Sequence, residues 1–189
     1  MKILRIIQTL LLCCCSLLLL AASQGPNNPS AATGAHWTNP SYIYSSNDAY
    51  TIYNRTAQEY LISSSNGFAI PTGSFINGIE IQIEGHGVSD GQSNIEVALS
   101  KNKTSPIGNS VTDILKLTTD SIATFGGPSD LWGASWTASE INSNNFGIMV
   151  RDKDAIAGEL DIDWENIKVF YTDPKDRRRH IASPGGLND

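Results

Sequence analysis

The chain has 189 residues, with 19 acidic side chains, 13 lysines and arginines and a net charge of −6. Nucleic acids and anionic membranes are bound through clustered lysines and arginines, so this acidic composition excludes both as partners. The cysteines, Cys13, Cys14 and Cys15, all lie in the first 23 residues.

The N-terminus has the order of a secretory signal peptide. Lys2 and Arg5 precede an apolar run from Leu10 to Ala22, which ends in small residues. We predict that residues 1–23 are removed and that the protein is secreted or displayed at the cell surface. The run is short for an anchor, which needs about 20 apolar residues, so the mature chain is predicted to have no membrane span. A retained anchor and a lipidated cysteine are the alternatives.

The mature chain divides into three parts by composition. Residues 24–36 are Pro, Gly, Asn, Ala and Ser, which predicts a flexible linker with nothing to bury. Residues 37–172 form the predicted domain, and residues 173–189 a disordered tail with a basic run from Arg177 to Arg179. Without its signal peptide the chain has no cysteine, hence no disulfide and no thiol chemistry.

The apolar residues of the domain recur with period two. Strands are predicted at residues 49–54, 59–63, 67–71, 79–84, 94–101, 146–151 and 159–164. Ile79, Ile81 and Ile83 share one face, with Glu80, Gln82 and Glu84 on the other. One apolar face per strand predicts an all-β antiparallel sandwich of jelly-roll type.

The last strand changes phase. Leu160, Ile162 and Trp164 alternate with acids up to Glu165, whereas Ile167, Val169 and Tyr171 continue the apolar face afterwards. This predicts a β-bulge near Glu165–Asn166. Before it, Thr137 followed three residues later by Glu140 forms a capping box, which predicts one short helical turn at residues 138–143.

Several motifs recur in a known order: "WTNP" (37–40), "FAIPTGSFINGIEIQIEG" (68–85), "GGPSDLWGASWTASEIN" (126–142) and "DWENIKVFYT" (163–172). Together they resemble a widespread β-sandwich module of secreted bacterial proteins and of phage or prophage structural proteins. The resemblance implies the fold and an extracellular setting, but it supplies no catalytic or ligand residue. Glu165 departs from the module, whose last strand usually has an apolar residue there.

Two interpretations of the tryptophan-rich block remain open. Gly126, Gly127 and Gly133 suit backbone with positive φ, and Trp132 and Trp136 would fold over one end of the sandwich as a plug. The alternative is an exposed aromatic platform for a ligand.

Aromatic residues also point to glycans, whose C–H faces pack on planar rings. Tyr42 and Tyr44 alternate onto one face and, with Trp132 and Trp136, are the candidate ligand-binding residues. Cross-strand aromatic packing is the competing interpretation.

Acidic residues surround a predicted hairpin turn at residues 155–158. Asp152, Asp154, Glu159 and Asp161 could supply oxygen ligands to calcium, the one cofactor that the sequence makes a candidate. The competing interpretation is a solvated acidic face.

Enzyme motifs such as G-x-S-x-G and H-E-x-x-H are absent from the sequence. We therefore predict a non-enzymatic binding or adhesion module that recognises extracellular glycan or a surface protein. A self-assembling surface or phage-derived protein is the second hypothesis, and a secreted hydrolase the third. Two glycosylation sequons, at Asn54 and Asn102, do not separate them.

Overall fold

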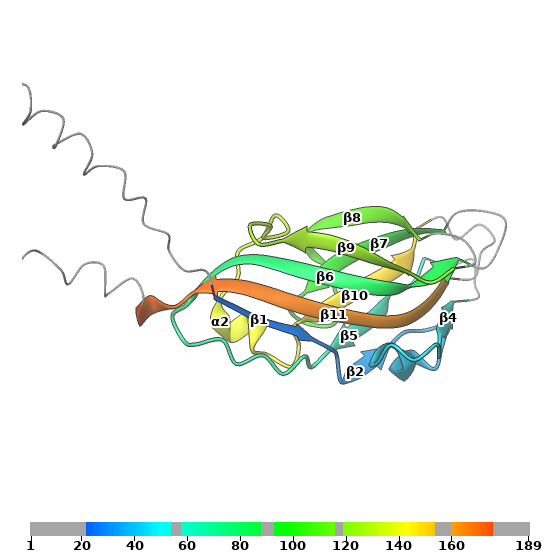
Figure 1. Cartoon of the computed structure of the whole chain (residues 1–189), viewed down its shortest axis with the longest axis horizontal. Helices are drawn as coiled ribbons and strands as arrows, with labels where there is room; N and C mark the ends of the chain where they lie inside the picture. The colour runs from blue at the N-terminus through cyan, green and yellow to red at the C-terminus, as the bar shows by residue number, and fades with distance from the viewer. Residues whose placement is uncertain (1–21, 54–57, 88–92, 116–118, 154–159, 176–189) are drawn as a thin grey trace, which may run out of the picture.

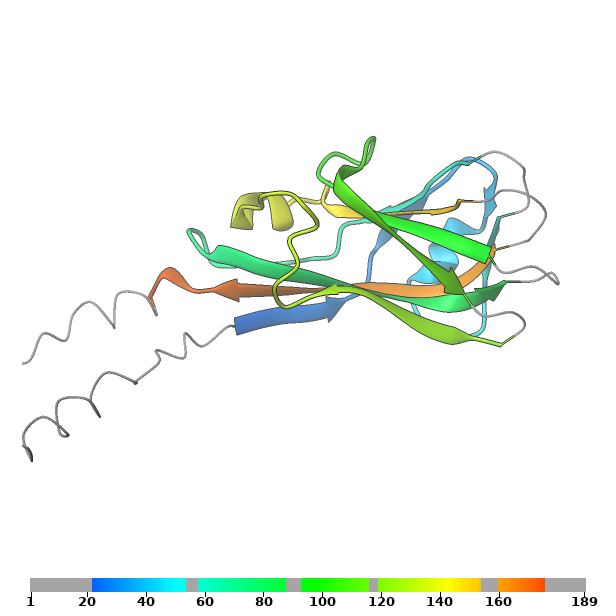
Figure 2. The same cartoon turned by 90° about the horizontal axis from the view of Figure 1, so that it is seen from above.

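A computed structural model describes residues 22–53, 58–87, 93–115, 119–153 and 160–175 as two β-sheets packed face to face (Figures 1 and 2). The predicted signal peptide up to residue 21 and the predicted tail from residue 176 lie outside this part of the chain. Within it, no helix has the length and apolar character needed to cross a membrane.

Sheet A contains six strands. β3 (Trp37–Thr38), β4 (Thr51–Tyr53), β11 (Leu160–Thr172), β6 (Phe75–Gly87) and β9 (Ser121–Gly127) follow one another, and β1 (Ala22–Asn27) also pairs with β11. Sheet B has the order β2 (Ala31–Thr33), β5 (Leu61–Ser64), β10 (Gly147–Asp152), β7 (Ser93–Ser100) and β8 (Ile107–Leu115). The 3₁₀ helix η1 (Pro40–Ile43) and the α-helix α2 (Ala138–Ile141) complete the elements.

The pairings are antiparallel, and most successive strands alternate between the two sheets. This connectivity is that of a jelly-roll-like sandwich, so the predicted fold class is confirmed. The core faces are also as predicted, because Ile79, Ile81 and Ile83 in sheet A and Ile95 and Val97 in sheet B have no exposed surface. Each such side chain contributes roughly 1.5–3 kcal/mol by leaving water.

The predicted bulge in β11 lies two residues earlier than the sequence indicated. Ile162 pairs with Gly85 and Trp164 with Glu84, which leaves Asp163 as the extra residue. The bulge turns Trp164 to the outer face, where its indole donates to Asn28 Oδ1. It turns Glu165 into the core, with no exposed surface, so the predicted faces of both residues are wrong.

The predicted linker at residues 24–36 is also wrong. β1 pairs with the second half of β11, and β2 pairs with β5 at the edge of sheet B. Side chains fasten β1 as well: Gln24 Oε1 accepts from the Ala69 amide, and Asn27 Nδ2 donates to Asn66 O. Backbone and amide hydrogen bonds hold this segment, and neither leaves a hydrophobic pattern in the sequence.

Residues 67–71, predicted as a strand, form no ladder. Phe68 and Ile70 are buried as expected, but Asn142 replaces a neighbouring strand. Its Oδ1 accepts from the Ile70 amide, and its Nδ2 donates to Ile70 O. β8 and β9 were not predicted, since edge strands rich in Ser, Thr and Gly lack a clear apolar alternation.

Candidate functional site

The tryptophan-rich block is a plug. Trp132 is buried, with 1% of its surface exposed, and its indole donates to Ile79 O at 2.9 Å. Gly126 permits this approach, because a Cβ there would lie 2.7 Å from Trp132 Nε1, and the glycine has φ +70°. Trp132 therefore offers no ring face to a ligand, and the plug interpretation fits the structure.

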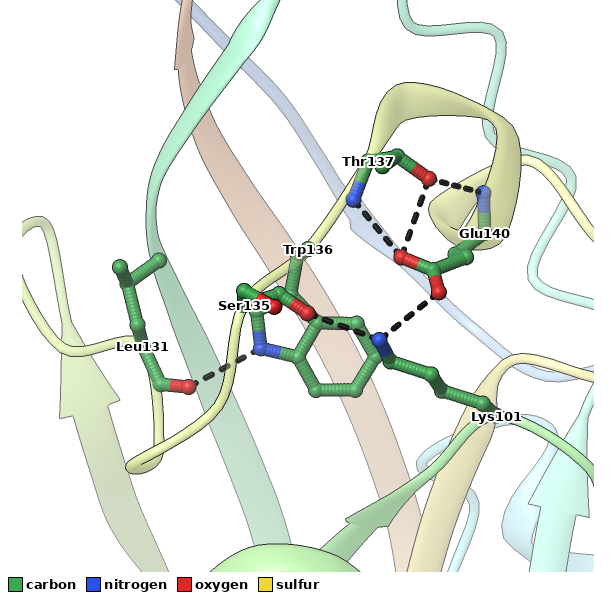
Figure 3. Close-up of polar contacts among 6 residues, drawn as sticks. All are labelled: Lys101, Leu131, Ser135, Trp136, Thr137 and Glu140. Carbon is green, nitrogen blue, oxygen red and sulfur yellow. Dashed lines mark hydrogen bonds and ion pairs between the residues drawn. The ribbon is translucent and has the colours of Figure 1, made fainter.

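Trp136 lies next to the plug and is held on several sides (Figure 3). Its indole donates to Leu131 O at 2.9 Å, Lys101 Nζ lies 4.9 Å from its ring centre, and Phe146 meets it edge to face. Lys101 also donates to Ser135 O and forms a 2.8 Å ion pair with Glu140. Only 8% of Trp136 is exposed, so this ring is packed against its neighbours and is not an exposed platform for a ligand.

The predicted capping box of α2 is confirmed, and its Glu140 forms the ion pair with Lys101 beside Trp136. Thr137 Oγ1 accepts from the Glu140 amide, and the Glu140 carboxylate accepts from the Thr137 amide. Burial acts to raise the pKa of Glu140, but hydrogen bonds from Lys101 and Thr137 hold that pKa below its ordinary value. The helix observed is Ala138–Ile141, slightly shorter than predicted.

The two candidate tyrosines lie away from the tryptophans. Tyr42 is exposed in η1, whereas Tyr44 packs against the core and forms an isolated bridge with Trp164. Trp164 pairs near the far end of β6, while Thr137 meets Phe75 at the beginning of that strand. The structure thus does not bring the four predicted ligand residues together.

The predicted calcium site is only partly covered by the structure. Asp152 ends β10 in sheet B and Asp161 lies in β11 of sheet A, and both are buried. Asp154 and Glu159 lie outside the described residues. The described residues contain no metal-binding group of three or more His, Cys, Asp or Glu side chains, so calcium binding stays a prediction.

The outer face of sheet B carries a cluster that the sequence did not single out. Arg151 on β10 pairs with Glu96 on β7, and both alternate with core residues of their strands. Tyr60, just before β5, points to the same face. We call Tyr60, Glu96 and Arg151 the polar cluster.

The polar cluster is tightly connected. Tyr60 Oη donates to Glu96 Oε1 at 2.8 Å, and Arg151 Nη2 lies 2.8 Å from the same oxygen. The Arg151 guanidinium stacks 4.7 Å from the Tyr60 ring centre. Burial and the bond to Glu96 raise the pKa of Tyr60 to about 12, so the phenol keeps its proton at neutral pH. Arg151 Nε is buried and lacks a hydrogen-bond partner among the described residues.

A groove adjoins the polar cluster through Tyr60. It has a volume of about 410 Å³, and its lining residues are Thr33, Gly34, Ala35, Gln58, Glu59, Tyr60, Ile62, Thr104 and Met149. A smaller hollow of about 130 Å³ shares Thr33 and Ile62 with it. We call these two adjoining hollows together the sheet groove. Ile62 supplies apolar surface, whereas Met149 is only 2% exposed, and Thr33, Gln58 and Thr104 supply polar groups.

A second hollow, which we call the end cleft, lies where β6 begins. Its volume is about 790 Å³, and its lining residues are Thr72, Gly73, Ser74, Phe75, Ile76, Leu131, Ser135, Trp136, Thr137, Ala138, Ser139 and Asn142. Trp136 is thus the one predicted ligand residue that lines either hollow.

Of the comparisons with known proteins, the one with solved structures finds proteins that are similar to this chain. No protein-family model matches the chain, and no curated protein matches it, so the resemblance to the bacterial and phage module stays a prediction. The similar structures include the CBM22-1 and GH10 modules of endo-1,4-β-D-xylanase 10B from Clostridium thermocellum complexed with xylohexaose, with 10% identity and a TM-score of 0.42. That match covers 82% of this chain and 26% of the other.

Two isolated modules are also similar. A family 29 carbohydrate-binding module from Piromyces equi has 8% identity and a TM-score of 0.38, over 82% of this chain and 92% of its own. The CBM22-1 xylan-binding domain from Paenibacillus barcinonensis has 10% identity and a TM-score of 0.34, over 80% and 93%. With TM-scores below 0.5, these similarities assign neither a ligand nor a site to this chain.

Proposed function

We propose that this protein is a secreted, non-catalytic carbohydrate-binding module and that the sheet groove receives the glycan. The observation that carries the proposal is the polar cluster, a tyrosine, a carboxylate and a guanidinium joined on the outer face of sheet B, whose Tyr60 also lines the sheet groove. Sugars need both parts of such a site, since their C–H faces bury against apolar surface and their hydroxyls require fixed donors and acceptors.

The cluster is ordered before any ligand arrives. Glu96 holds Tyr60 and Arg151 through one oxygen, so binding would cost little side-chain entropy. Arg151 keeps 24% of its side-chain surface exposed and Glu96 keeps 9%, so the guanidinium is the more accessible of the two charged groups. Tyr60 stays protonated at neutral pH because its pKa is about 12, and since its proton is donated to Glu96, its oxygen can accept a hydrogen bond from a sugar hydroxyl.

Retention on polysaccharide tests the proposal. The purified mature protein is run through gels containing xylan, soluble cellulose or glycogen, and tighter hits are titrated calorimetrically with oligosaccharides. We expect Tyr60→Ala to lose retention at least tenfold, because it removes the ring and the hydroxyl together. Tyr42→Ala is the matched control, since that exposed tyrosine of η1 does not line the groove. Retention that depends on Tyr42 and not on Tyr60, or no retention at all, would overturn the assignment.

The same samples distinguish binding from hydrolysis. Glu59 lines the sheet groove and Glu96 lies beside it, so these two carboxylates are the pair that a glycosidase would use here. We expect no release of reducing ends during prolonged incubation with the retained polysaccharide. Release that disappears in Glu96→Gln would replace the binding proposal with an enzymatic one.

Self-assembly is the second candidate function. β8 and β9 are the last strands of their sheets and lie close to each other, and they carry exposed Val111 and Ile122, at 36% and 55%. Edge strands with apolar side chains pair readily with other chains. Sedimentation velocity across a hundredfold concentration range tests this. A shift to larger species that Ile122→Lys abolishes would favour assembly, and a constant monomer would reject it.

A further inference from the structure

The end cleft differs in chemistry from the sheet groove and shares no lining residue with it. None of the residues that line it is charged. Hydroxyl residues alternate with apolar ones along its walls, and its volume of about 790 Å³ lies in the range of small-molecule sites. Such a lining favours an uncharged ligand that has both hydroxyls and an apolar face.

Phe75 supplies the aromatic surface of this cleft. It is the first residue of β6 and is 50% exposed, although most large apolar side chains of the sandwich are buried. An exposed ring in a concave site can cover the C–H face of a sugar, and its partial burial by a ligand is favourable. Ile76 and Leu131 extend the apolar surface beside it.

Ser74 adds an unsatisfied polar group. Its residue is only 8% exposed, and its Oγ is buried and has no hydrogen-bond partner among the described residues. Buried hydroxyls in folded proteins are nearly always paired, so an unpaired hydroxyl in the wall of a cleft indicates a missing partner. A ligand hydroxyl would supply it.

The part of the cleft wall formed by Trp136 is held rigidly in place without a ligand. Trp136 is fixed by Leu131 O, Lys101 and Phe146, and Lys101 is in turn fixed by Glu140 of the capping box (Figure 3). Lys101 and Glu140 are not among the lining residues, so the cleft gains rigidity without gaining a charged lining. Rigid walls lower the entropic cost of binding.

We propose that the end cleft is a second binding site, separate from the sheet groove, for a neutral saccharide that stacks on Phe75 and hydrogen-bonds to Ser74. The two hollows would then contact different glycan units or different chains. This site does not require the sheet groove to bind, and the sheet groove does not require this site.

The indole N–H signal of Trp136 in a ¹H–¹⁵N correlation spectrum is the reporter, assigned by comparison with Trp136→Phe. The intact mature protein is titrated with xylotetraose, cellotetraose and glucose up to about 10 mM, which covers millimolar dissociation constants. We expect a saturable shift of the Trp136 signal. Ser74→Ala should weaken binding about three- to tenfold, the loss of one neutral hydrogen bond, without lowering the melting temperature.

Phe75→Ala should abolish the shift, and Ile122→Ala is its matched control, because Ile122 is similarly exposed but pairs with Glu84, near the other end of β6 from the cleft. No Trp136 shift with any probe, or a shift unchanged in Phe75→Ala, overturns the proposal. So does a shift that Tyr60→Ala eliminates, because the cleft would then only report binding in the groove. A Trp136 shift that survives in Tyr60→Ala supports the second site even where the sheet groove binds nothing.

Discussion

Two glutamates in the sandwich, Glu165 and Glu96, meet opposite environments. Glu165 points from β11 into the core and has one partner, Ser63 of the facing sheet, whose Oγ donates to Oε2 at 3.0 Å. Its other oxygen is buried without a hydrogen-bond partner among the described residues. Glu96 points outward from β7 and accepts from Tyr60 while pairing with Arg151.

The difference shows that partners, and not burial alone, determine what a carboxyl can do. Both residues are less than 10% exposed, yet one has a guanidinium at 2.8 Å and the other has only a hydroxyl. Burial raises the pKa of Glu165 to about 8, and the Ser63 hydrogen bond only partly opposes this. At neutral pH Glu165 is therefore a neutral acid in the core, whereas Glu96 is ion-paired with Arg151 on the outer face of sheet B.

The largest expected effect is the pH dependence that Glu165 imposes on stability. The native state keeps the Glu165 proton up to about pH 8, whereas the unfolded chain loses it above its ordinary value of 4.5. The unfolded state therefore binds fewer protons between these values, and the free energy of unfolding falls as pH rises through this window. The total loss is about 5 kcal/mol, since one pKa unit is worth about 1.4 kcal/mol.

Urea unfolding of the wild type and of Glu165→Gln from pH 4 to pH 9 measures this dependence. Gln stays neutral throughout, whereas the other titrating groups are the same in both proteins. Their contributions therefore cancel in the difference between the two curves, and that difference reports Glu165 alone. We expect Glu165→Gln to gain stability relative to the wild type as pH rises. Parallel curves would show that Glu165 is ionised in the native core and would end the contrast with Glu96.

The second expected effect concerns the outer glutamate. Glu96→Ala leaves Arg151 without its carboxylate and Tyr60 without its acceptor, and we expect a loss of about 2 kcal/mol in unfolding free energy. A fully buried broken pair costs about 3–5 kcal/mol, and partial exposure of Arg151 reduces this cost. Glu96→Gln keeps the acceptor for Tyr60 and should lose about half as much. Equal losses in the two variants would mean that the missing charge accounts for the whole effect and that the hydrogen bond from Tyr60 contributes nothing to stability.

These two glutamates also show what the sequence could and could not predict. The alternation of apolar and polar residues correctly places Ile79 in the core and Glu96 on the outer face. It can do so because a period of two depends only on neighbouring residues. The inward direction of Glu165 depends on which residue bulges, and Asp163 carries no signal that distinguishes it from its neighbours. Predicting one bulge two residues too late was enough to exchange Trp164 and Glu165 between faces.

The candidate sites were harder to predict for a related reason. Glu96 and Arg151 lie on two paired strands and Tyr60 directly precedes a third, and only the antiparallel register of sheet B brings the three together. The tryptophans are conspicuous in the sequence, but their polar atoms bond to Ile79 O and Leu131 O in the plug. The residue type suggested that these tryptophans bind a ligand, whereas their packing shows that they stabilise the fold.

The third prediction returns to the core. Ser63→Ala removes the one hydrogen bond that Glu165 receives, and we expect a loss of about 1–2 kcal/mol, the cost of a buried polar group left unsatisfied. In Glu165→Leu the same serine substitution should be nearly neutral, because the carboxyl is no longer there. Chemical unfolding of the four proteins at pH 5, where the native carboxyl is neutral, gives this coupling energy. Additive losses would show that Ser63 and Glu165 do not interact.

The smallest expected effect separates the two roles of Tyr60. Tyr60→Phe keeps the ring beneath Arg151 and removes only the hydrogen bond to Glu96, so we expect a loss of about 1 kcal/mol in unfolding free energy. Spectroscopic titration of the wild type should show one tyrosine ionising near pH 12 that is missing from the variant. If the phenol oxygen accepts a hydrogen bond from bound glycan, Tyr60→Phe will also weaken retention while Tyr60→Ala abolishes it. Unchanged retention in Tyr60→Phe would mean that the ring alone contacts the sugar and that the hydrogen bond to Glu96 is not needed for binding.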